Sequence, residues 1–276
     1  MAQPGDSVEA LLDLVASRRG VDFRDHRRTA IERGVDARLK ATGVPDISRY
    51  IELLAREPSE IERLIESFVV PVSSFFRDRE VFDALETSVI PDQLARTAGP
   101  LRTWVAGAAT GEEAWSWAML LCWCRDMFGG PPVEVLGSDL DKRSLALARA
   151  GRYPAASAAD IPRRFNARFV TPDGDDVVIA NGLRGCVRFG NHDLNGPALA
   201  PREAILASFQ IISLRNVLIY LDEPLRRRVL ERLHSILKPE GVLVLGTVET
   251  LPVALRANFI SYPGTPAALH IFQRTS

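Results

Sequence analysis

The sequence predicts an α/β fold with a Rossmann-like sheet and an inserted small β-subdomain, preceded by a small all-α N-terminal domain. Residues 101–121, LRTWVAGAATGEEAWSWAMLL, read as an apolar strand, a turn of small residues and a helix. Further apolar runs, typical of parallel strands buried on both faces, alternate with helical segments toward the C-terminus. The first 70 residues instead carry apolar residues at helical spacing. These patterns predict a helical domain at 1–70, a linker at 71–90 and a cofactor-binding domain at 91–276.

Composition excludes several classes of protein. With 276 residues, 46% of them hydrophobic, the chain can bury a large core and a small one. Its net charge of −1 gives no general attraction to nucleic acid or to a membrane. There is neither a basic leader with a cleavage site nor an apolar run near the roughly 20 residues that span a bilayer. We therefore expect a cytoplasmic protein without membrane insertion.

Cysteine spacing and the standard catalytic motifs are also informative. Cys122, Cys124 and Cys186 lack CxxC spacing, so we expect reduced, packed thiols and no metal site. The sequence contains no GxxxxGK[ST] loop, no GxSxG elbow and no HExxH helix. This argues against nucleotide hydrolysis, serine hydrolysis and zinc proteolysis.

The N-terminal region reads as three or four short helices. Residues 42–45, TGVP, end one helix, and Asp46 or Ser48 can cap the next. Residues 18–40 hold eight basic side chains against four acidic ones, so this face is either solvated surface or a docking site for an acidic helix. The basic residues are Arg18, Arg19, Arg24, Arg27, Arg28, Arg33, Arg38 and Lys40.

The following segment joins the helical region to the α/β region. Pro71 halts the preceding helix, and Ser73 or Ser74 can cap a new one. The paired Phe75 and Phe76 are expected in a core. Arg77 then lies either at the edge of a cofactor cleft or on ordinary surface.

The small-residue turn after the first strand is the expected cofactor site. Gly107, Ala108 and Gly111 leave little side-chain bulk, so a ligand can approach the backbone closely. Glu112 and Glu113 open the next helix, where they would repel a pyrophosphate and attract an ammonium or sulfonium group. The turn therefore favours S-adenosylmethionine over a dinucleotide.

The second strand, from residue 133, leads to two aspartates. Asp139 lies 28 positions past Gly111, where a doubly wound fold places a carboxylate that binds ribose hydroxyls. Asp141 fits a helix N-cap better. Residues 152–187 are irregular, with several prolines and the turn PDG, and we expect an inserted subdomain at about 153–187.

The remaining strands carry polar residues at their ends. Asp193 can accept a hydrogen bond from an adenine amine and Leu194 can pack on the ring, whereas His192 is expected on a surface loop. The apolar run 209–214 ends at Arg215 and Asn216, which face the ligand crevice in a doubly wound sheet. Tyr220 follows on the same loop. Glu249, after the strand at 242–245, either caps a turn or faces the cleft, and a hairpin at 259–262 and 269–273 closes the sheet.

Five ordered motifs resemble those of the chemotaxis receptor methyltransferase family, CheR. They are VSSFFRD, AGAATGEEAWSWAMLL, LGSDLD with LARAGRYP, LRNVLIYLDEP and LKPEGVLVLGTVETL, and the resemblance spans about residues 10–275. The resemblance implies a class I methyltransferase domain. It also implies transfer of a methyl group from S-adenosylmethionine to glutamate side chains of chemoreceptors, which leaves S-adenosylhomocysteine.

The resemblance also assigns site residues. Tyr220 falls near the transferred methyl, and with Arg77 it is our candidate for orienting the acceptor. Pro71 and Ser73 stand where the family has asparagine and threonine, which indicates a divergent member. The residues that fall at or beside the family's cofactor site are Ser73, Arg77, Gly107, Ala108, Glu113, Asp139, Asp193, Leu194, Arg215 and Asn216.

Three functions follow from these observations. The first is a protein-glutamate O-methyltransferase whose basic face, residues 18–40, docks chemoreceptor helices and which acts as a monomer. The second is a regulatory module that binds S-adenosylmethionine or S-adenosylhomocysteine without turnover. The third is a methyltransferase with another acceptor, and the near-zero net charge disfavours nucleic acid in that role.

Overall fold

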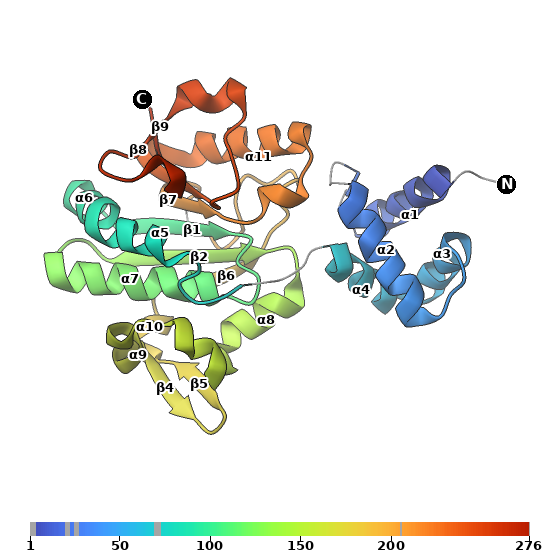
Figure 1. Ribbon diagram of the computed structural model, residues 1–276, viewed down its shortest axis with the longest axis horizontal. Helices are drawn as coiled ribbons and strands as arrows, with labels where there is room; N and C mark the ends of the chain where they lie inside the picture. The colour runs from blue at the N-terminus through green and yellow to red at the C-terminus, as the bar shows by residue number, and fades with distance from the viewer. Residues whose placement is uncertain (1–3, 20–22, 25–27, 69–72, 205, 276) are drawn as a thin grey trace. The chain divides into compact units, whose positions relative to one another are not determined.

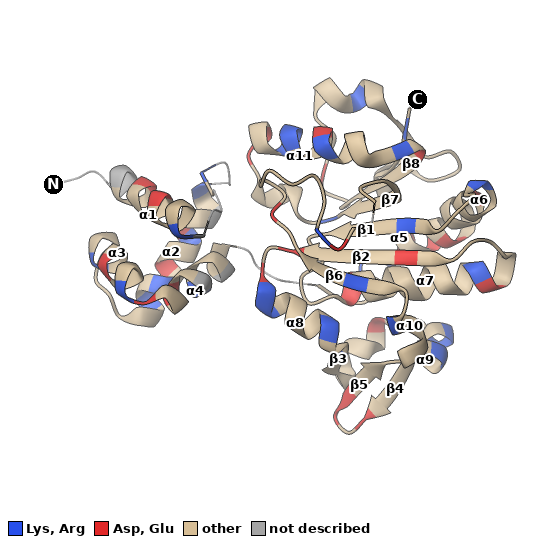
Figure 2. Cartoon of the chain, turned by 180° about the vertical axis from the view of Figure 1, so that it is seen from behind, with Lys and Arg blue, Asp and Glu red and all other residues tan. Residues whose placement is uncertain are grey.

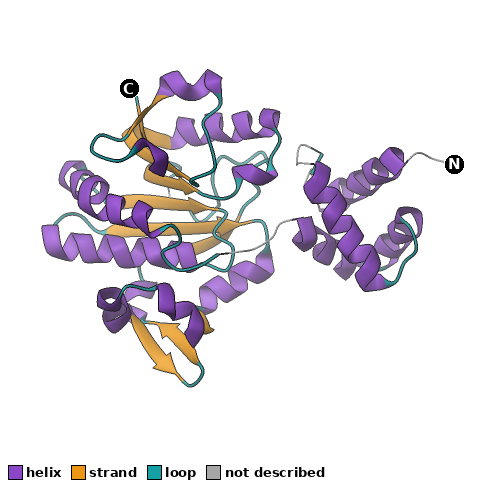
Figure 3. Cartoon of the chain, viewed as in Figure 1, coloured by secondary structure: helices purple, strands orange, loops and turns teal. Residues whose placement is uncertain are grey.

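The computed structural model describes residues 4–19, 23–24, 28–68, 73–204 and 206–275. These divide into two compact units. The four N-terminal helices, grouped with residues 195–197 and 218–229, make up one unit. The other described residues make up the larger unit, which holds the strands. Figures 1 and 3 show the helices and strands of both.

The N-terminal helices are α1 (Pro4–Arg19), α2 (Arg28–Thr42), α3 (Ile47–Arg56) and α4 (Pro58–Phe68). The sequence prediction of three or four helices is confirmed, as are the stop at Thr42 and the cap at Asp46. The Asp46 side chain accepts a hydrogen bond from the Arg49 amide at 2.9 Å. Leu11, Val15 and Leu54 are buried, so the apolar faces form the core of this unit.

The larger unit begins with α5 (Arg79–Ala84), a π-helical turn (Leu85–Val89) and α6 (Ile90–Arg96). The main sheet then has the order β6-β2-β1-β7-β8-β10-β9. Its parallel strands are β1 (Leu101–Ala106), β2 (Val133–Asp139), β6 (Val187–Asn191), β7 (Phe209–Leu214) and β8 (Leu237–Leu245). The antiparallel strands are β9 (Phe259–Ser261) and β10 (Ile271–Arg274), which confirms the predicted closing hairpin.

Helices lie between β1 and β2, between β2 and β6, and between β7 and β8, as in a doubly wound fold. They are α7 (Glu112–Phe128), α8 (Lys142–Ala150) and α11 (Glu223–Ile236). All six residues of β7 are buried, as the apolar run at 209–214 predicts. Asp141 caps α8 by accepting from the amides of Arg143 and Ser144, both at 2.9 Å, which confirms its interpretation as an N-cap.

A small three-stranded sheet follows α8. It has the order β3-β5-β4, with β3 (Arg152–Pro154), β4 (Val170–Asp173) and β5 (Asp176–Ile179). Short helices accompany it: a 3₁₀ turn (Ala155–Asp160), α9 (Arg163–Phe169) and α10 (Asn181–Arg184). In Figure 3 its strands form the separate hairpin below the main sheet. Residues 152–187 are irregular in sequence because they alternate short strands with short helices.

The three cysteine thiols are free, and the Sγ atoms of Cys122 and Cys186 lie 3.8 Å apart. In the part of the chain that the structure describes, no helix is both long and apolar enough to cross a membrane. The same described residues contain no group of three or more His, Cys, Asp or Glu side chains that could hold a metal ion.

Candidate functional site

The candidate site lies at the carboxyl edge of the parallel strands. Strand β1 pairs with β2 on one side and β7 on the other, so the direction of winding changes between β1 and β7. In such sheets a crevice for ligands opens outside the strand ends at this point. The carboxyl ends of β1, β2 and β7 lie side by side here (Figure 1). They carry the small-residue turn after β1, Asp139 at the last position of β2, and the pair Arg215 and Asn216 directly after β7.

The turn after β1 is fixed by backbone contacts. The amides of Gly107 and Ala108 both donate to the Ser138 carbonyl at 2.8 Å. Gly107 has a φ of +79°, and a Cβ there would lie 2.4 Å from Val217 Cγ2. Glycine is therefore required because the chain after β7 approaches closely, a reason that the sequence analysis did not foresee.

Asp139 shapes this turn from the neighbouring strand. Its Oδ2 accepts from the Ala109 amide at 2.8 Å and its Oδ1 from the Asp141 amide at 2.9 Å. Burial raises the pKa of its carboxyl, although these amide hydrogen bonds oppose the shift. Asp139 thus links the ends of β1 and β2, and ribose binding by its carboxylate stays a prediction.

Glu113, in the first turn of α7, lies against the end of β7. Its Oε1 accepts from the Ser213 hydroxyl at 2.6 Å. Its Oε2 lies 3.3 Å from Arg215 Nη1 in an ion pair. The negative charge that we expected to attract a sulfonium group is therefore shared with a protein cation.

Arg215 turns its guanidinium into the protein. Only 1% of its side chain is exposed. Nη2 donates to the Arg77 carbonyl at 2.7 Å and to Asp78 Oδ2 at 2.8 Å, and the guanidinium lies 5.5 Å from the centre of the Phe82 ring. Arg215 therefore ties the segment before α5 to α7, a role that the sequence pattern alone did not reveal.

The segment around Arg77 is anchored by its aromatic neighbours. Phe76 is buried, stacks on Phe165 with ring centres 5.0 Å apart, and donates its amide to Ser116 Oγ at 2.9 Å. Phe75 is buried against Tyr153. These contacts confirm the expected core position of both phenylalanines. Arg77, between them and α5, is half-buried.

The predicted helix cap in this segment is wrong. Neither Ser73 nor Ser74 begins a helix, since α5 starts at Arg79 with Asp78 at the N-cap position. The physical reason is the backbone between them. Phe76 and Asp78 have φ values of 49° and 57°, in the left-handed region, which an α-helix does not contain. Pro71, the predicted stop, lies outside the described residues.

The end of β6 holds the predicted adenine-binding pair. Asp193 and Leu194 follow directly after His192, and the Leu194 carbonyl accepts from Arg232 at 3.2 Å. The expected surface position of His192 is wrong. It is buried edge-on against Trp104, with ring centres 5.5 Å apart, and burial lowers its pKa to about 4. A neutral imidazole fits this aromatic contact.

The sequence left open whether Glu249 caps a turn or faces the cleft, and the structure shows that it caps a turn. Its Oε2 accepts from the amides of Gly246, at 2.7 Å, and Asn216, at 2.9 Å. It therefore closes the turn after β8 and binds the loop after β7. Tyr220 ends the 3₁₀ helix Leu218–Tyr220 in the other unit, so its role at the crevice stays a prediction.

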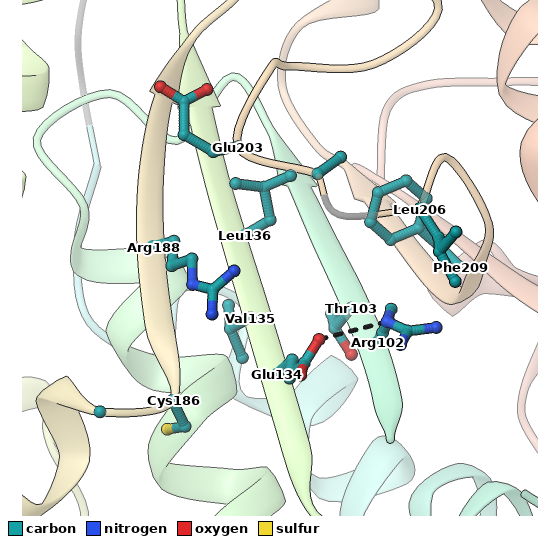
Figure 4. A pocket seen from close by; sticks show the side chains of 12 residues that line it. Arg102, Thr103, Glu134, Val135, Leu136, Cys186, Arg188, Glu203, Leu206 and Phe209 are labelled. Atoms are coloured by element: carbon teal, nitrogen blue, oxygen red, sulfur yellow. Dashed lines mark hydrogen bonds and ion pairs between the residues drawn. The ribbon is translucent and has the colours of Figure 1, made fainter. Parts of the chain in front are cut away.

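A separate pocket lies toward the amino ends of the strands. Figure 4 shows Arg102 of β1 paired with Glu134 of β2, with Leu136 further along β2 and Arg188 on the adjacent β6. The Arg102 Nε and Glu134 Oε2 atoms lie 3.2 Å apart. This pocket contains none of the predicted site residues, and it lies at the end of the sheet opposite the crevice.

The basic face of residues 18–40 is partly neutralised within its own unit. Arg28 pairs with Glu9 and Glu32. Arg38 donates to the buried Glu60 through Nε and Nη2 at 2.8 and 2.9 Å. Figure 2 shows acidic and basic residues interspersed on these helices. Arg33 and Lys40 are exposed, whereas Arg27 lies outside the described residues.

Comparison with known proteins gives matches over almost the whole chain. The family model described as "CheR methyltransferase, SAM binding domain" matches residues 71–267. A second, "CheR methyltransferase, all-alpha domain", matches residues 6–69.

Individual relatives agree with these matches. "Chemotaxis protein methyltransferase 2" of Pseudomonas aeruginosa is 32% identical, over 83% of this chain and 81% of its own length. The "Chemotaxis protein methyltransferase" of Escherichia coli is 31% identical, over 86% of this chain and 81% of its own. An uncharacterized 104.1 kDa protein of Rhodobacter capsulatus is 31% identical over 90% of this chain, which spans only 26% of that protein.

Proposed function

Because this chain belongs to the CheR methyltransferase family, we propose that it methylates glutamate carboxylates of chemoreceptors to give glutamyl methyl esters. S-adenosylmethionine, the cofactor of the matched domain, supplies a methyl group made electrophilic by a positively charged sulfur. The observation that carries the proposal is the start of α7, where two glutamates follow directly on the small-residue turn beside the change of winding between β1 and β7.

The residues at the crevice fit this cofactor. The carboxylates of Glu113, whose charge is shared with Arg215, and of Asp139 offer acceptors for hydroxyl groups. Glu112 adds a negative charge at the same helix end that favours a positive centre. A pyrophosphate would be repelled there. We propose that the cofactor site comprises the following residues: Ser73, Arg77, Gly107, Ala108, Glu113, Asp139, Asp193, Leu194, Arg215 and Asn216.

Positioning supplies most of the catalysis in this proposal. A glutamate acceptor is ionised at neutral pH, since its reference pKa is about 4.3, so no strong general base is required. Holding an acceptor oxygen in line with the reacting bond recovers several of the about 7–11 kcal/mol available from proximity. Arg77 and Tyr220 are proposed to orient the acceptor carboxylate.

Methyl transfer tests the function directly. The chain is incubated with S-adenosylmethionine tritiated on its methyl group and with receptor cytoplasmic fragments. Labelled methyl esters, released as methanol by base, are expected only with enzyme present. If the chain binds the cofactor but no receptor fragment acquires base-labile label, the proposed methyltransferase activity is contradicted. That result would support a regulatory module that binds the cofactor without turnover.

The site assignment has its own test. Arg77→Ala and Asp139→Ala are expected to weaken S-adenosylhomocysteine binding, measured by calorimetry, by about tenfold or more, equal to about 1.4 kcal/mol. Arg79→Ala is the matched control, since Arg79 lies two residues away and is 60% exposed. Wild-type affinity in both site variants would refute the assignment.

The docking face is proposed separately. We propose that residues 18–40 bind an acidic receptor helix in the cytoplasm and that the enzyme acts as a monomer. The double variant Arg33→Glu, Lys40→Glu is expected to raise KM for the receptor and to leave cofactor affinity unchanged, because both side chains are exposed. Arg56→Glu, exposed on α3, is the control. An equal rise in KM for the control would contradict the proposal that residues 18–40 form the docking face.

A further inference from the structure

Glu249 is a charged side chain with almost no access to solvent. It is 3% exposed, and it lies in the turn after β8 rather than in a helix or strand. A buried carboxylate is costly unless hydrogen bonds compensate for lost hydration. Here Oε2 accepts from two backbone amides, those of Gly246 at 2.7 Å and Asn216 at 2.9 Å.

The two amides belong to loops that follow neighbouring parallel strands. Leu214 at the end of β7 pairs with Leu245 at the end of β8, so both loops leave the same edge of the sheet. Strand β7 borders the crevice at the point where the winding changes. A carboxylate that accepts hydrogen bonds from both loops therefore holds in place the loop after β7, which lines one side of the crevice.

Asn216 requires such support because its backbone is strained. Its φ is 59°, in the left-handed region, which non-glycine residues rarely adopt, although asparagine tolerates it better than most. The hydrogen bond from its amide to Glu249 stabilises that conformation. Val217, next in the chain, then packs against Gly107 in the turn after β1.

The space around Gly246 indicates the same close arrangement. A Cβ on Gly246 would lie 2.8 Å from Glu249 Oε2 and 3.0 Å from both nitrogen atoms of Asn216. His270 Nδ1 lies 3.1 Å from the Gly246 carbonyl, so the residue directly before β10 also contacts this turn. Glu249, Gly246 and Asn216 are thus packed without room for an added methyl group.

We propose that Glu249 is a positioning residue for the cofactor crevice, which acts by fixing the backbone of Asn216 and thereby Arg215 and Val217. The proposal rests on the proposed function, since it takes S-adenosylmethionine as the ligand of this crevice. Glu249 works through its hydrogen-bond acceptor oxygen, and its effect falls on cofactor binding rather than on receptor binding.

Two substitutions separate acceptor geometry from charge. Glu249→Gln keeps an oxygen that can accept from both amides and is expected to retain S-adenosylhomocysteine affinity within about threefold. Glu249→Ala removes the acceptor and is expected to weaken affinity by about tenfold or more, with KM for the receptor unchanged. Glu240→Ala is the matched control, since Glu240 lies on the same strand β8 and its side chain is 64% exposed.

Each outcome decides the proposal. Wild-type affinity in Glu249→Ala overturns it. Equal weakening by Gln and Ala also overturns it, because the charge would then act directly. Should Glu249→Ala fail to fold, Gly246→Ala disturbs the same contact and is expected to weaken affinity, whereas unchanged affinity there overturns the proposal. A wild-type chain that binds no S-adenosylhomocysteine at all contradicts the proposed function instead, before any variant is compared.

Discussion

Arg215 and Asn216 are consecutive residues, and each is held by a carboxylate from elsewhere in the chain. Arg215 pairs with Glu113 of α7 and with Asp78, and the Asn216 amide donates to Glu249. The sequence places both residues at the carboxyl end of a strand, where ligand contacts are expected. Their fixed conformation depends on partners 33 to 138 positions away.

Removing Arg215 is expected to be strongly destabilising. Arg215→Met leaves Glu113 and Asp78 without their cation, and breaking a buried ion pair from one side costs about 3–5 kcal/mol. The free energy of unfolding is measured by urea titration. Arg96→Met is the control, because Arg96 pairs with Asp92 and Glu240 near solvent and its removal should cost at most about 1 kcal/mol for each exposed pair. Similar losses in the two variants would contradict the buried role of Arg215.

Helices α7 and α8 approach closely at Gly111. Its φ is +96°, and a Cβ there would lie 2.6 Å from Ala148 Cβ and 2.9 Å from Ala148 Cα. Gly111→Ala therefore combines a strained backbone with overpacking, and it is expected to lower the free energy of unfolding by about 2–4 kcal/mol. Gly182→Ala is the control, since a Cβ there would meet no neighbouring atom within 4 Å. A stable Gly111→Ala variant would show that the two helices can separate.

Glu60 joins three of the N-terminal helices. Buried on α4, it accepts from Tyr50 of α3 at 2.7 Å and from Arg38 of α2. Burial alone would raise the pKa of its carboxyl, but hydrogen bonds from Tyr50, Arg38 and Arg63 outweigh this and hold the pKa below its ordinary value. A lowered pKa means that ionised Glu60 stabilises the fold above its unfolded pKa of about 4.5, and that this contribution is lost as pH falls through the folded pKa.

The lowered pKa of Glu60 determines how its contribution to stability depends on pH. Glu60→Gln is expected to be less stable than wild type at pH 7, and the difference should shrink once the pH falls below about 4.5. Thermal unfolding of both chains between pH 7 and pH 3 measures this difference. A gap that stays constant over the range would mean that ionisation of Glu60 contributes nothing.

For the whole molecule, the proposed cofactor should stabilise the folded chain. A ligand at 100 times its Kd adds about 2.7 kcal/mol to the free energy of unfolding, enough to raise Tm by several degrees. S-adenosylhomocysteine is expected to give this shift in a thermal unfolding experiment. The dinucleotide NAD is the control, because Glu112 and Glu113 should repel its pyrophosphate. A rise in Tm with NAD but not with S-adenosylhomocysteine would indicate a dinucleotide as the ligand and contradict the proposed cofactor.

The sequence by itself determined the alternation of strands and helices, the small-residue turn, the two glutamates of α7, the helix cap at Asp141 and the family to which the chain belongs. These features are local, since apolar periodicity, turn residues and caps act over a few neighbouring positions. Only the tertiary structure decided the buried position of His192, the left-handed backbone between Phe76 and Asp78, and the partners of Arg215 and Glu249. Each of these depends on contacts between residues distant in sequence, and burial decides whether a charge faces a ligand or another part of the protein.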